Sequence, residues 1–223
     1  MRILCIGDSL GLPRENVEYE SVWFYKLQNY FPEYEFISQF ERGLLIQKAL
    51  DNFDTYYTFY CSDIIIIQTG ICDCAPRYIV EKGISIRIVK KLFTIFGLTK
   101  FYWKIIKLRG RKPSCVETPI DVFSTKYNEL VLRFIKGGAK RIYLITIGHV
   151  AESVVKKSPY INNNVDKYNR EIRQISTKYP EIVRVISPLD RVDESYFVDG
   201  YHGNAQGMDV VYNSLKTELS KVR

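Results

Sequence analysis

The sequence predicts a single three-layer α/β domain with a five-stranded, mainly parallel sheet, and three observations support this fold class. The chain has 223 residues, the size of one domain, and its 46% apolar and 26% charged residues form an ordinary globular mixture. Short apolar runs alternate with longer amphipathic segments, as in chains built from β-α-β units. The apolar runs are continuous, which is typical of strands that helices cover on both faces.

Five segments are predicted to be strands, and the third carries four consecutive isoleucines. In chain order the strands are 2–6, 35–40, 63–69, 141–147 and 183–186. Helices are predicted at 18–31, 45–57, 121–136, 162–178 and 205–221. Pro32, Gly137 and Pro180 mark the ends of three of these helices. We therefore expect 1–223 to form one domain whose ligand sites lie beyond the carboxyl ends of the strands.

The segment 82–116 departs from this pattern because of its charge. It holds ten lysines and arginines and no acidic residue, and removing these ten leaves 22 basic against 25 acidic residues in a chain of net charge +7. Apolar residues recur in it at spacings of three and four around Gly97, which predicts a basic amphipathic insertion of helical pieces. Two interpretations stay open: a peripheral contact with an anionic membrane, or a helical cover on the sheet with solvated lysines.

Cysteine usage and hydropathy bear on the compartment and on cofactors. Five cysteines without regular spacing are typical of reduced thiols, and no apolar run has the length of a signal-peptide core or a membrane span. We therefore expect a cytoplasmic protein, with a peripheral position at the inner membrane face as an extension. Cys72 and Cys74 are too close for a zinc knuckle, so we expect no metal and no cofactor. Nucleic acid is the weakest partner hypothesis because no recognition motif appears, and the oligomeric state is not predicted.

Two short motifs at opposite ends of the chain carry the chemistry. The first predicted strand ends in Gly7-Asp8-Ser9-Leu10, which places the serine at an exposed strand-to-helix turn. Near the other end, Asp199-Gly200-Tyr201-His202 sets a carboxylate three residues before a histidine. Such a carboxylate orients the imidazole, which then removes the proton of a serine hydroxyl. Either motif alone is explained by a turn, whereas the two together predict a serine nucleophile.

These residues resemble the SGNH hydrolases, also called the GDSL esterase/lipase family, over nearly the whole chain apart from the insertion. The resemblance implies a flavodoxin-like three-layer fold and acyl-ester chemistry. It implies that Ser9 is the nucleophile, His202 the base and Asp199 the partner of the base. It also implies an oxyanion hole formed by the backbone N–H groups of Ser9 and Gly43.

A third family motif is altered. Gly-x-Asn-Asp normally follows the third strand, but this chain has Gly70-Ile71-Cys72-Asp73, so Cys72 stands where an asparagine donates to the oxyanion. A thiol is a poor donor, and losing one oxyanion donor costs about 100 to 1,000-fold in rate. Three alternatives follow. Arg14 or Arg77 replaces the missing donor, the backbone N–H groups of Ser9 and Gly43 suffice to stabilise the oxyanion, or the protein is a weak or degenerate enzyme. The candidate substrate or oxyanion contacts are Asp8, Arg14, Gly70, Cys72, Asp73, Arg77 and His149.

The run Cys74-Ala75-Pro76-Arg77 resembles a block in SGNH-like proteins associated with bacterial surface-polysaccharide assembly. This resemblance implies a serine-dependent ester hydrolase or O-acyl (acetyl) transferase that acts on an acylated carbohydrate in surface-polysaccharide metabolism. A simple carboxylesterase is the next alternative. A catalytically degenerate binding or scaffold protein, attached to an anionic membrane or a glycan, is an alternative of another class. Asn162 to Asn164 are expected to cap the helix that follows them.

Overall fold

The computed structural model describes residues 1–80, 84–106, 108, 110–190 and 193–222. They form one five-stranded sheet of order β2-β1-β3-β4-β5 in which every neighbouring pair is parallel. The strands are β1 (Arg2–Gly7), β2 (Glu35–Phe40), β3 (Ile64–Gln68), β4 (Arg141–Ile145) and β5 (Val183–Ile186). The predicted α/β fold class is therefore confirmed, and the predicted strands differ from the observed ones only at their ends.

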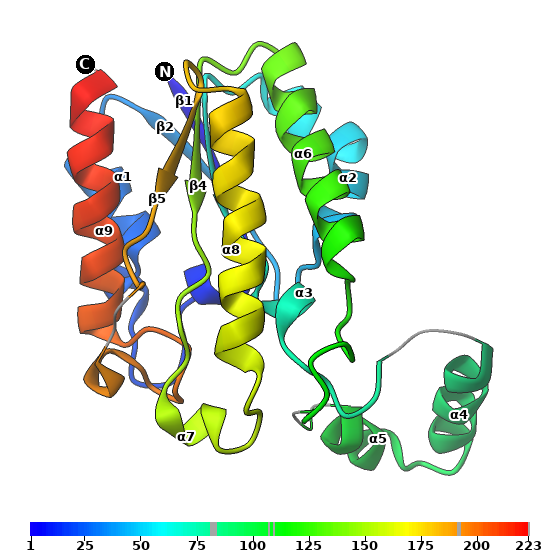
Figure 1. Cartoon of the computed structure of the whole chain (residues 1–223). Coiled ribbons are helices and arrows are strands. Elements are labelled where there is room, and N and C mark those ends of the chain that lie inside the picture. Colours follow the sequence, from blue (N-terminus) through cyan, green and yellow to red (C-terminus); the bar gives the residue numbers. More distant parts are fainter. Residues whose placement is uncertain (81–83, 107, 109, 191–192, 223) are drawn as a thin grey trace.

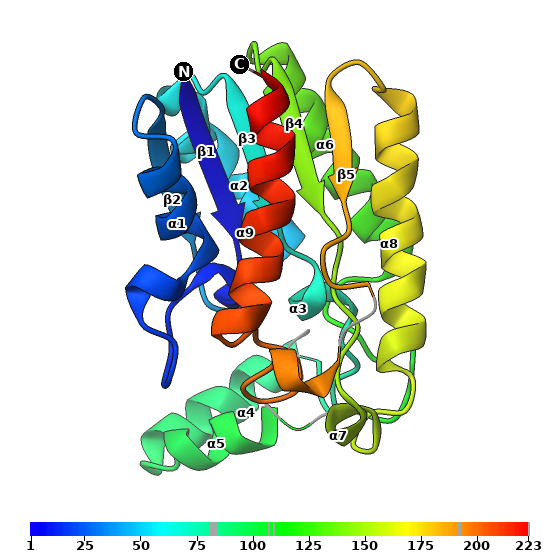
Figure 2. The same cartoon turned by 90° about the vertical axis from the view of Figure 1, so that its left-hand side faces the viewer.

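Helices cover both faces of the sheet (Figures 1 and 2). One face carries α1 (Trp23–Tyr30) and α9 (Ala205–Leu219), and the other carries α2 (Ile46–Thr55), α6 (Ile120–Lys136) and α8 (Ile161–Lys178). Alternate residues of β3 pack into opposite apolar clusters, with Ile64 and Ile66 in one and Ile65 and Ile67 in the other. The run of four isoleucines is thus explained, because side chains of a strand point to opposite faces in turn.

One predicted helix begins later than its sequence pattern indicates. The segment expected to be helical from residue 18 starts as a short 3-10 helix, η2 (Tyr19–Ser21), and α1 begins only at Trp23. The backbone is extended at Val22, between Ser21 and Trp23, and this residue separates the two pieces. The remaining short elements are η1 (Ser9–Gly11), η3 (Tyr57–Tyr60), α3 (Ile71–Cys74), α7 (Glu152–Val155), η4 (Glu194–Tyr196) and η5 (Ser220–Val222).

The basic insertion forms a helical hairpin beyond the carboxyl end of the sheet (Figures 1 and 2). Its helices are α4 (Ile84–Ile95) and α5 (Thr99–Ile106), and Gly97 between them has a φ of +69°. The hairpin projects from the domain instead of covering the sheet, so the interpretation as a helical cover is wrong. Lys82, Lys107 and Arg109 of the predicted basic set lie outside the described residues. None of the helices described is both long and apolar enough to cross a lipid bilayer.

Candidate active site

The structure brings Ser9, His202 and Asp199 together. Ser9 opens η1 directly after β1, and the other two residues lie in the loop between η4 and α9. Ser9 Oγ lies 3.0 Å from His202 Nε2, and His202 Nδ1 lies 2.7 Å from Asp199 Oδ2. Because a carboxylate only accepts, Nδ1 carries the proton in this contact. Nε2 is then the nitrogen able to take the proton of the serine hydroxyl.

The loop that carries Asp199 and His202 is held by its own hydrogen bonds. Asp199 Oδ1 accepts from the backbone N–H of His202 at 3.1 Å, and Val198 N–H donates to the carbonyl of His202 at 2.8 Å. The Tyr201 ring packs against the imidazole with a centroid distance of 4.0 Å. Burial alone would raise the pKa of Asp199, but hydrogen bonds from the His202 ring and backbone outweigh it and lower the pKa to about 2. Asp199 is therefore an ionised partner for the imidazole at neutral pH.

The turn at Ser9 is fixed from both sides. Asp8 Oδ1 accepts from the backbone N–H of Leu10 at 2.9 Å and so caps η1. Arg14 Nη2 donates to the carbonyl of Ser9 at 2.7 Å. Burial lowers the pKa of the Arg14 guanidinium, and the nearby Asp199 carboxylate opposes that shift. Arg14 thus binds the backbone carbonyl of the candidate nucleophile, and its contact with an oxyanion stays a prediction.

The candidate oxyanion donors gather at one end of the sheet. Gly7 pairs with the last residues of β2 and β3, so the loops that follow these strands begin beside the Ser9 turn. Gly43 lies in the first of these loops with a φ of +76°, and Cys72 lies half-buried in α3 after the second. The backbone N–H groups of Ser9 and Gly43 donate to no other group in the part of the chain that the structure describes. Neither N–H group therefore has a competing acceptor among these residues.

Asp8 and Asp73 are buried beneath this end of the sheet. The expectation that their side chains contact substrate is therefore wrong. Both side chains are 0% exposed. Asp73 accepts from the backbone N–H of Ile46 at 3.2 Å and from Thr118 Oγ1 at 2.5 Å. Burial raises the pKa of Asp8 to about 7 and that of Asp73 to about 6. Sequence reasoning missed Thr118, because a contact across 45 residues leaves no local signal.

Gly70 shapes the backbone before α3, and Arg77 is held through its backbone N–H, while a contact of its side chain with substrate stays a prediction. Gly70 precedes α3 with a φ of +126°, and a Cβ there would lie 2.7 Å from Ile147 Cδ1. Only glycine fits both the torsion and the space. Arg77 lies at the base of the hairpin, where its N–H donates to the carbonyl of Cys115 at 2.7 Å. Among the described residues, no group of three His, Cys, Asp or Glu side chains is placed to hold a metal ion.

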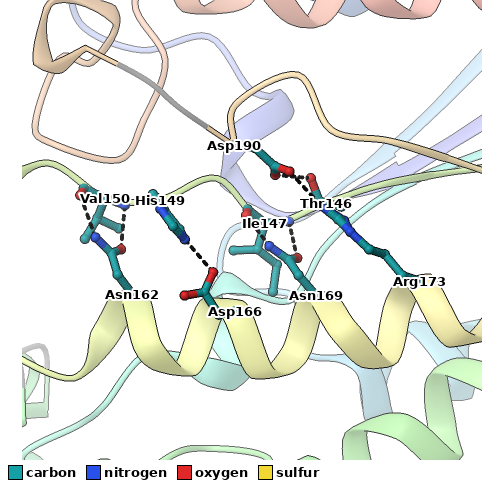
Figure 3. A network of polar contacts seen from close by, with 9 residues as sticks. All are labelled: Thr146, Ile147, His149, Val150, Asn162, Asp166, Asn169, Arg173 and Asp190. Carbon is teal, nitrogen blue, oxygen red and sulfur yellow. Dashed lines mark hydrogen bonds and ion pairs between the residues drawn. The ribbon is translucent and has the colours of Figure 1, made fainter.

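His149 belongs to a polar network between α8 and the segment after β4 (Figure 3). Its Nε2 lies 2.7 Å from Asp166 Oδ1. On either side of this pair, Asn162 binds both the N–H and the carbonyl of Val150, and Asn169 does the same to Ile147. The structure therefore places His149 against α8, in a network that fixes the loop after β4.

The prediction that Asn162 to Asn164 cap α8 is wrong. The helix begins at Ile161, Tyr160 is its N-cap residue, and no side chain caps it. Asn164 instead donates to the carbonyl of Cys74 at 3.0 Å and to that of Pro113 at 2.9 Å. It ties α8 to the end of α3 and to the segment after the hairpin, across 90 and 51 residues respectively.

Comparison with known proteins relates the chain to solved esterase structures. No protein-family model and no curated protein sequence matches it. TesA superposes with a TM-score of 0.66 over 100% of both chains at 11% identity. The psychrotrophic esterase EstA from Pseudoalteromonas sp. gives 0.61 over 98% of both chains at 16% identity. The acetyl xylan esterase AlAXEase gives 0.64 over 98% of this chain and 99% of the other at 14% identity. The chain therefore has the fold of the SGNH hydrolases.

Proposed function

We propose that this protein is a serine-dependent ester hydrolase or O-acyltransferase. The observation that carries the proposal is the 3.0 Å contact between Ser9 Oγ and His202 Nε2, with Asp199 on the far side of the imidazole. As the hydroxyl oxygen attacks the ester carbonyl carbon, its proton passes to Nε2. The ionised Asp199 stabilises the imidazolium that forms, and the attacked carbonyl oxygen becomes an oxyanion.

The second half of the reaction uses the same residues. The oxyanion would accept from the backbone N–H groups of Ser9 and Gly43, which donate to nothing else in the described residues. Collapse of the tetrahedral intermediate breaks the bond between the carbonyl carbon and the leaving oxygen, and the imidazolium of His202 protonates that oxygen so that it departs as an alcohol. The acyl group is then esterified to Ser9. Water or a sugar hydroxyl then attacks the acyl carbon while His202 takes its proton. The imidazolium returns that proton to the Ser9 oxygen as the bond between that oxygen and the acyl carbon breaks.

The substrate class we propose is an O-acetylated carbohydrate of a surface polysaccharide. Two structural neighbours are described as acetyl xylan esterases, which supports acetyl esters of carbohydrates as the substrates to test first. The run Cys74-Ala75-Pro76-Arg77 adds the resemblance to proteins of surface-polysaccharide assembly. Whether the acyl group passes to water or to a glycan depends on the acceptor that enters after the first alcohol leaves. Supplying an acetyl donor with and without a glycan acceptor, and measuring acetylated product against free acetate, separates the two.

Covalent labelling tests the proposal most directly. We expect a fluorophosphonate probe to modify Ser9, because only a serine beside a general base is nucleophilic enough to displace fluoride. The adduct, located by peptide mass spectrometry, should be absent in Ser9→Ala and formed at least about 100-fold more slowly in His202→Ala. Hydrolysis of p-nitrophenyl acetate should fall in parallel. Unchanged hydrolysis in both variants would contradict the serine mechanism.

A second candidate function is favoured by Cys72. A thiol in place of a side-chain amide leaves the oxyanion hole with two backbone donors, as expected of a protein that keeps the fold and has lost catalysis. Such a protein would bind a glycan or a membrane without turning over an ester. The labelling experiment separates the candidates. The absence of a Ser9 adduct in the folded wild-type protein would favour the binding function, and its presence the enzyme.

A further inference from the structure

The α4–α5 hairpin exposes apolar side chains at the tip of the molecule. Ile88, Leu92 and Ile95 follow one another at four and three residues, so they share one face of α4. Leu92 is 46% exposed, Ile95 is 66% exposed and Phe96 is 71% exposed. Phe101 on α5 is also more than half exposed. Exposed apolar side chains gathered in this way mark a surface that another body covers.

The two helices of the hairpin already pack against each other, so these side chains are not exposed for want of a contact between α4 and α5. The Phe93 ring stacks on that of Phe101 at a centroid distance of 6.3 Å and meets that of Tyr102 at 5.7 Å. Tyr102 is only 3% exposed. The hairpin therefore holds together through its inner face while it presents a second apolar face, which includes Leu92 and Ile95, outward.

The same hairpin is strongly cationic. Lys90, Lys91, Lys100 and Lys104 are exposed on it, and Arg111 and Lys112 are exposed at its base. No acidic residue lies between 82 and 116, whereas the rest of the chain carries 22 basic and 25 acidic residues. The positive charge of the protein is thus concentrated on the projecting element that also exposes apolar side chains.

We propose that the hairpin binds the surface of an anionic phospholipid bilayer. Leu92, Ile95 and Phe96 would enter the headgroup and acyl boundary while the lysines pair with lipid phosphates. Helices of 12 and 8 residues are too short to span the bilayer, so they lie in its surface. A second copy of the chain would bring two sets of lysines and arginines together, and a nucleic acid offers no apolar phase for the apolar side chains.

The position of the hairpin determines which end of the domain a bound bilayer would face. It lies beyond the carboxyl end of the sheet, the end that also carries Ser9 (Figures 1 and 2). Its base is tied to the domain by hydrogen bonds from Tyr78 N–H to the carbonyl of Leu108 at 3.1 Å and from Gly110 N–H to the carbonyl of Pro76 at 2.9 Å. A bilayer bound to the hairpin would therefore face the candidate active site, whether or not the proposed chemistry is correct.

Vesicle co-sedimentation of the full-length protein tests the proposal. We expect binding to phosphatidylcholine vesicles that contain about one third phosphatidylglycerol, and loss of binding in high salt or with phosphatidylcholine alone. Lys91→Ala/Lys104→Ala should lower the partition coefficient about 30-fold, which corresponds to about 1 kcal/mol for each lysine at the surface. Leu92→Glu/Ile95→Glu should abolish binding because it places carboxylates in the contact.

Lys167→Ala/Lys178→Ala removes the same charge from exposed positions of α8 and should bind like the wild type. Thermal unfolding of each variant is measured beside the wild type, and we expect each domain to remain folded. Equal partitioning onto neutral and anionic vesicles, or undiminished binding by Leu92→Glu/Ile95→Glu, would overturn the proposal. Two further results would overturn the proposal. One is a wild-type dimer in sedimentation velocity that becomes a monomer in Leu92→Glu/Ile95→Glu, and the other is tighter binding to duplex DNA than to the anionic vesicles.

Discussion

Cys72 stands where the resemblance to the SGNH hydrolases implies an asparagine. It lies in α3, at the end of the sheet that carries Ser9, and its side chain packs partly against the core. The two candidate backbone donors, Ser9 and Gly43, are fixed by the turns after β1 and β2. In the proposed mechanism these two donors would stabilise the oxyanion in part, and a third donor would strengthen the site.

Cys72→Asn should therefore raise the rate of ester hydrolysis. A carboxamide N–H is a much better hydrogen-bond donor than a thiol, and one donor contributes about 100 to 1,000-fold in kcat when ideally placed. We expect a rise of at least about tenfold in kcat with p-nitrophenyl acetate, with a smaller change in KM. Cys72→Ala is the control and should not raise kcat. Equal rates in Cys72→Asn and the wild type would show that the two backbone donors suffice.

At the scale of an element, the loop between η4 and α9 sets how Asp199 and His202 lie relative to Ser9. Gly200 has a φ of +94°, and its carbonyl accepts from the N–H of Ala151 at 2.7 Å. A Cβ at this position would lie 2.6 Å from Val154 Cγ2. The loop is thus pressed against α7, and this contact sets where Asp199 and His202 stand relative to Ser9.

Gly200→Ala should damage both stability and activity. The positive φ costs a non-glycine residue about 1 to 3 kcal/mol, and the clash with Val154 displaces the loop further. We expect the free energy of urea unfolding to fall by at least that amount and kcat/KM to fall by about tenfold or more. Gly203→Ala is a matched control in the same loop, because a Cβ there finds its nearest neighbour at 3.4 Å. The reasoning would fail if Gly203→Ala were the more damaging substitution.

At the scale of the whole molecule, sequence reasoning succeeded where burial or topology leaves a local pattern. The isoleucines of β3 predicted a strand covered on both faces, and parallel strands place their carboxyl ends together, which brought Ser9 and His202 to one rim. It failed for polar side chains whose partners are distant in sequence. Asp73 accepts a hydrogen bond from Thr118, and Asn164 donates one to the carbonyl of Cys74. No spacing in the sequence predicts which of these polar groups face inward.

The buried carboxyls of Asp8 and Asp73 make the free energy of unfolding depend on pH. Burial raises the pKa of Asp8 to about 7, well above its value of about 3.9 in an unfolded chain. Between these two values the folded state therefore binds more protons than the unfolded state, so the free energy of unfolding falls as pH rises. Asp73, with a pKa raised to about 6, acts in the same direction. The stability that both protonated carboxyls contribute is present below pH 4 and is lost by about pH 7.

Asp8→Asn should remove most of this pH dependence. The amide cannot ionise, and its oxygen can still accept from the N–H of Leu10. Relative to the wild type, we expect the free energy of unfolding of the variant to rise by about 2 to 4 kcal/mol between pH 5 and pH 8, measured by urea denaturation. Asp51→Asn, which alters an exposed carboxyl on α2, should leave the wild-type slope in place. Parallel stability curves for Asp8→Asn and the wild type would mean that Asp8 is not the group whose proton stabilises the folded state.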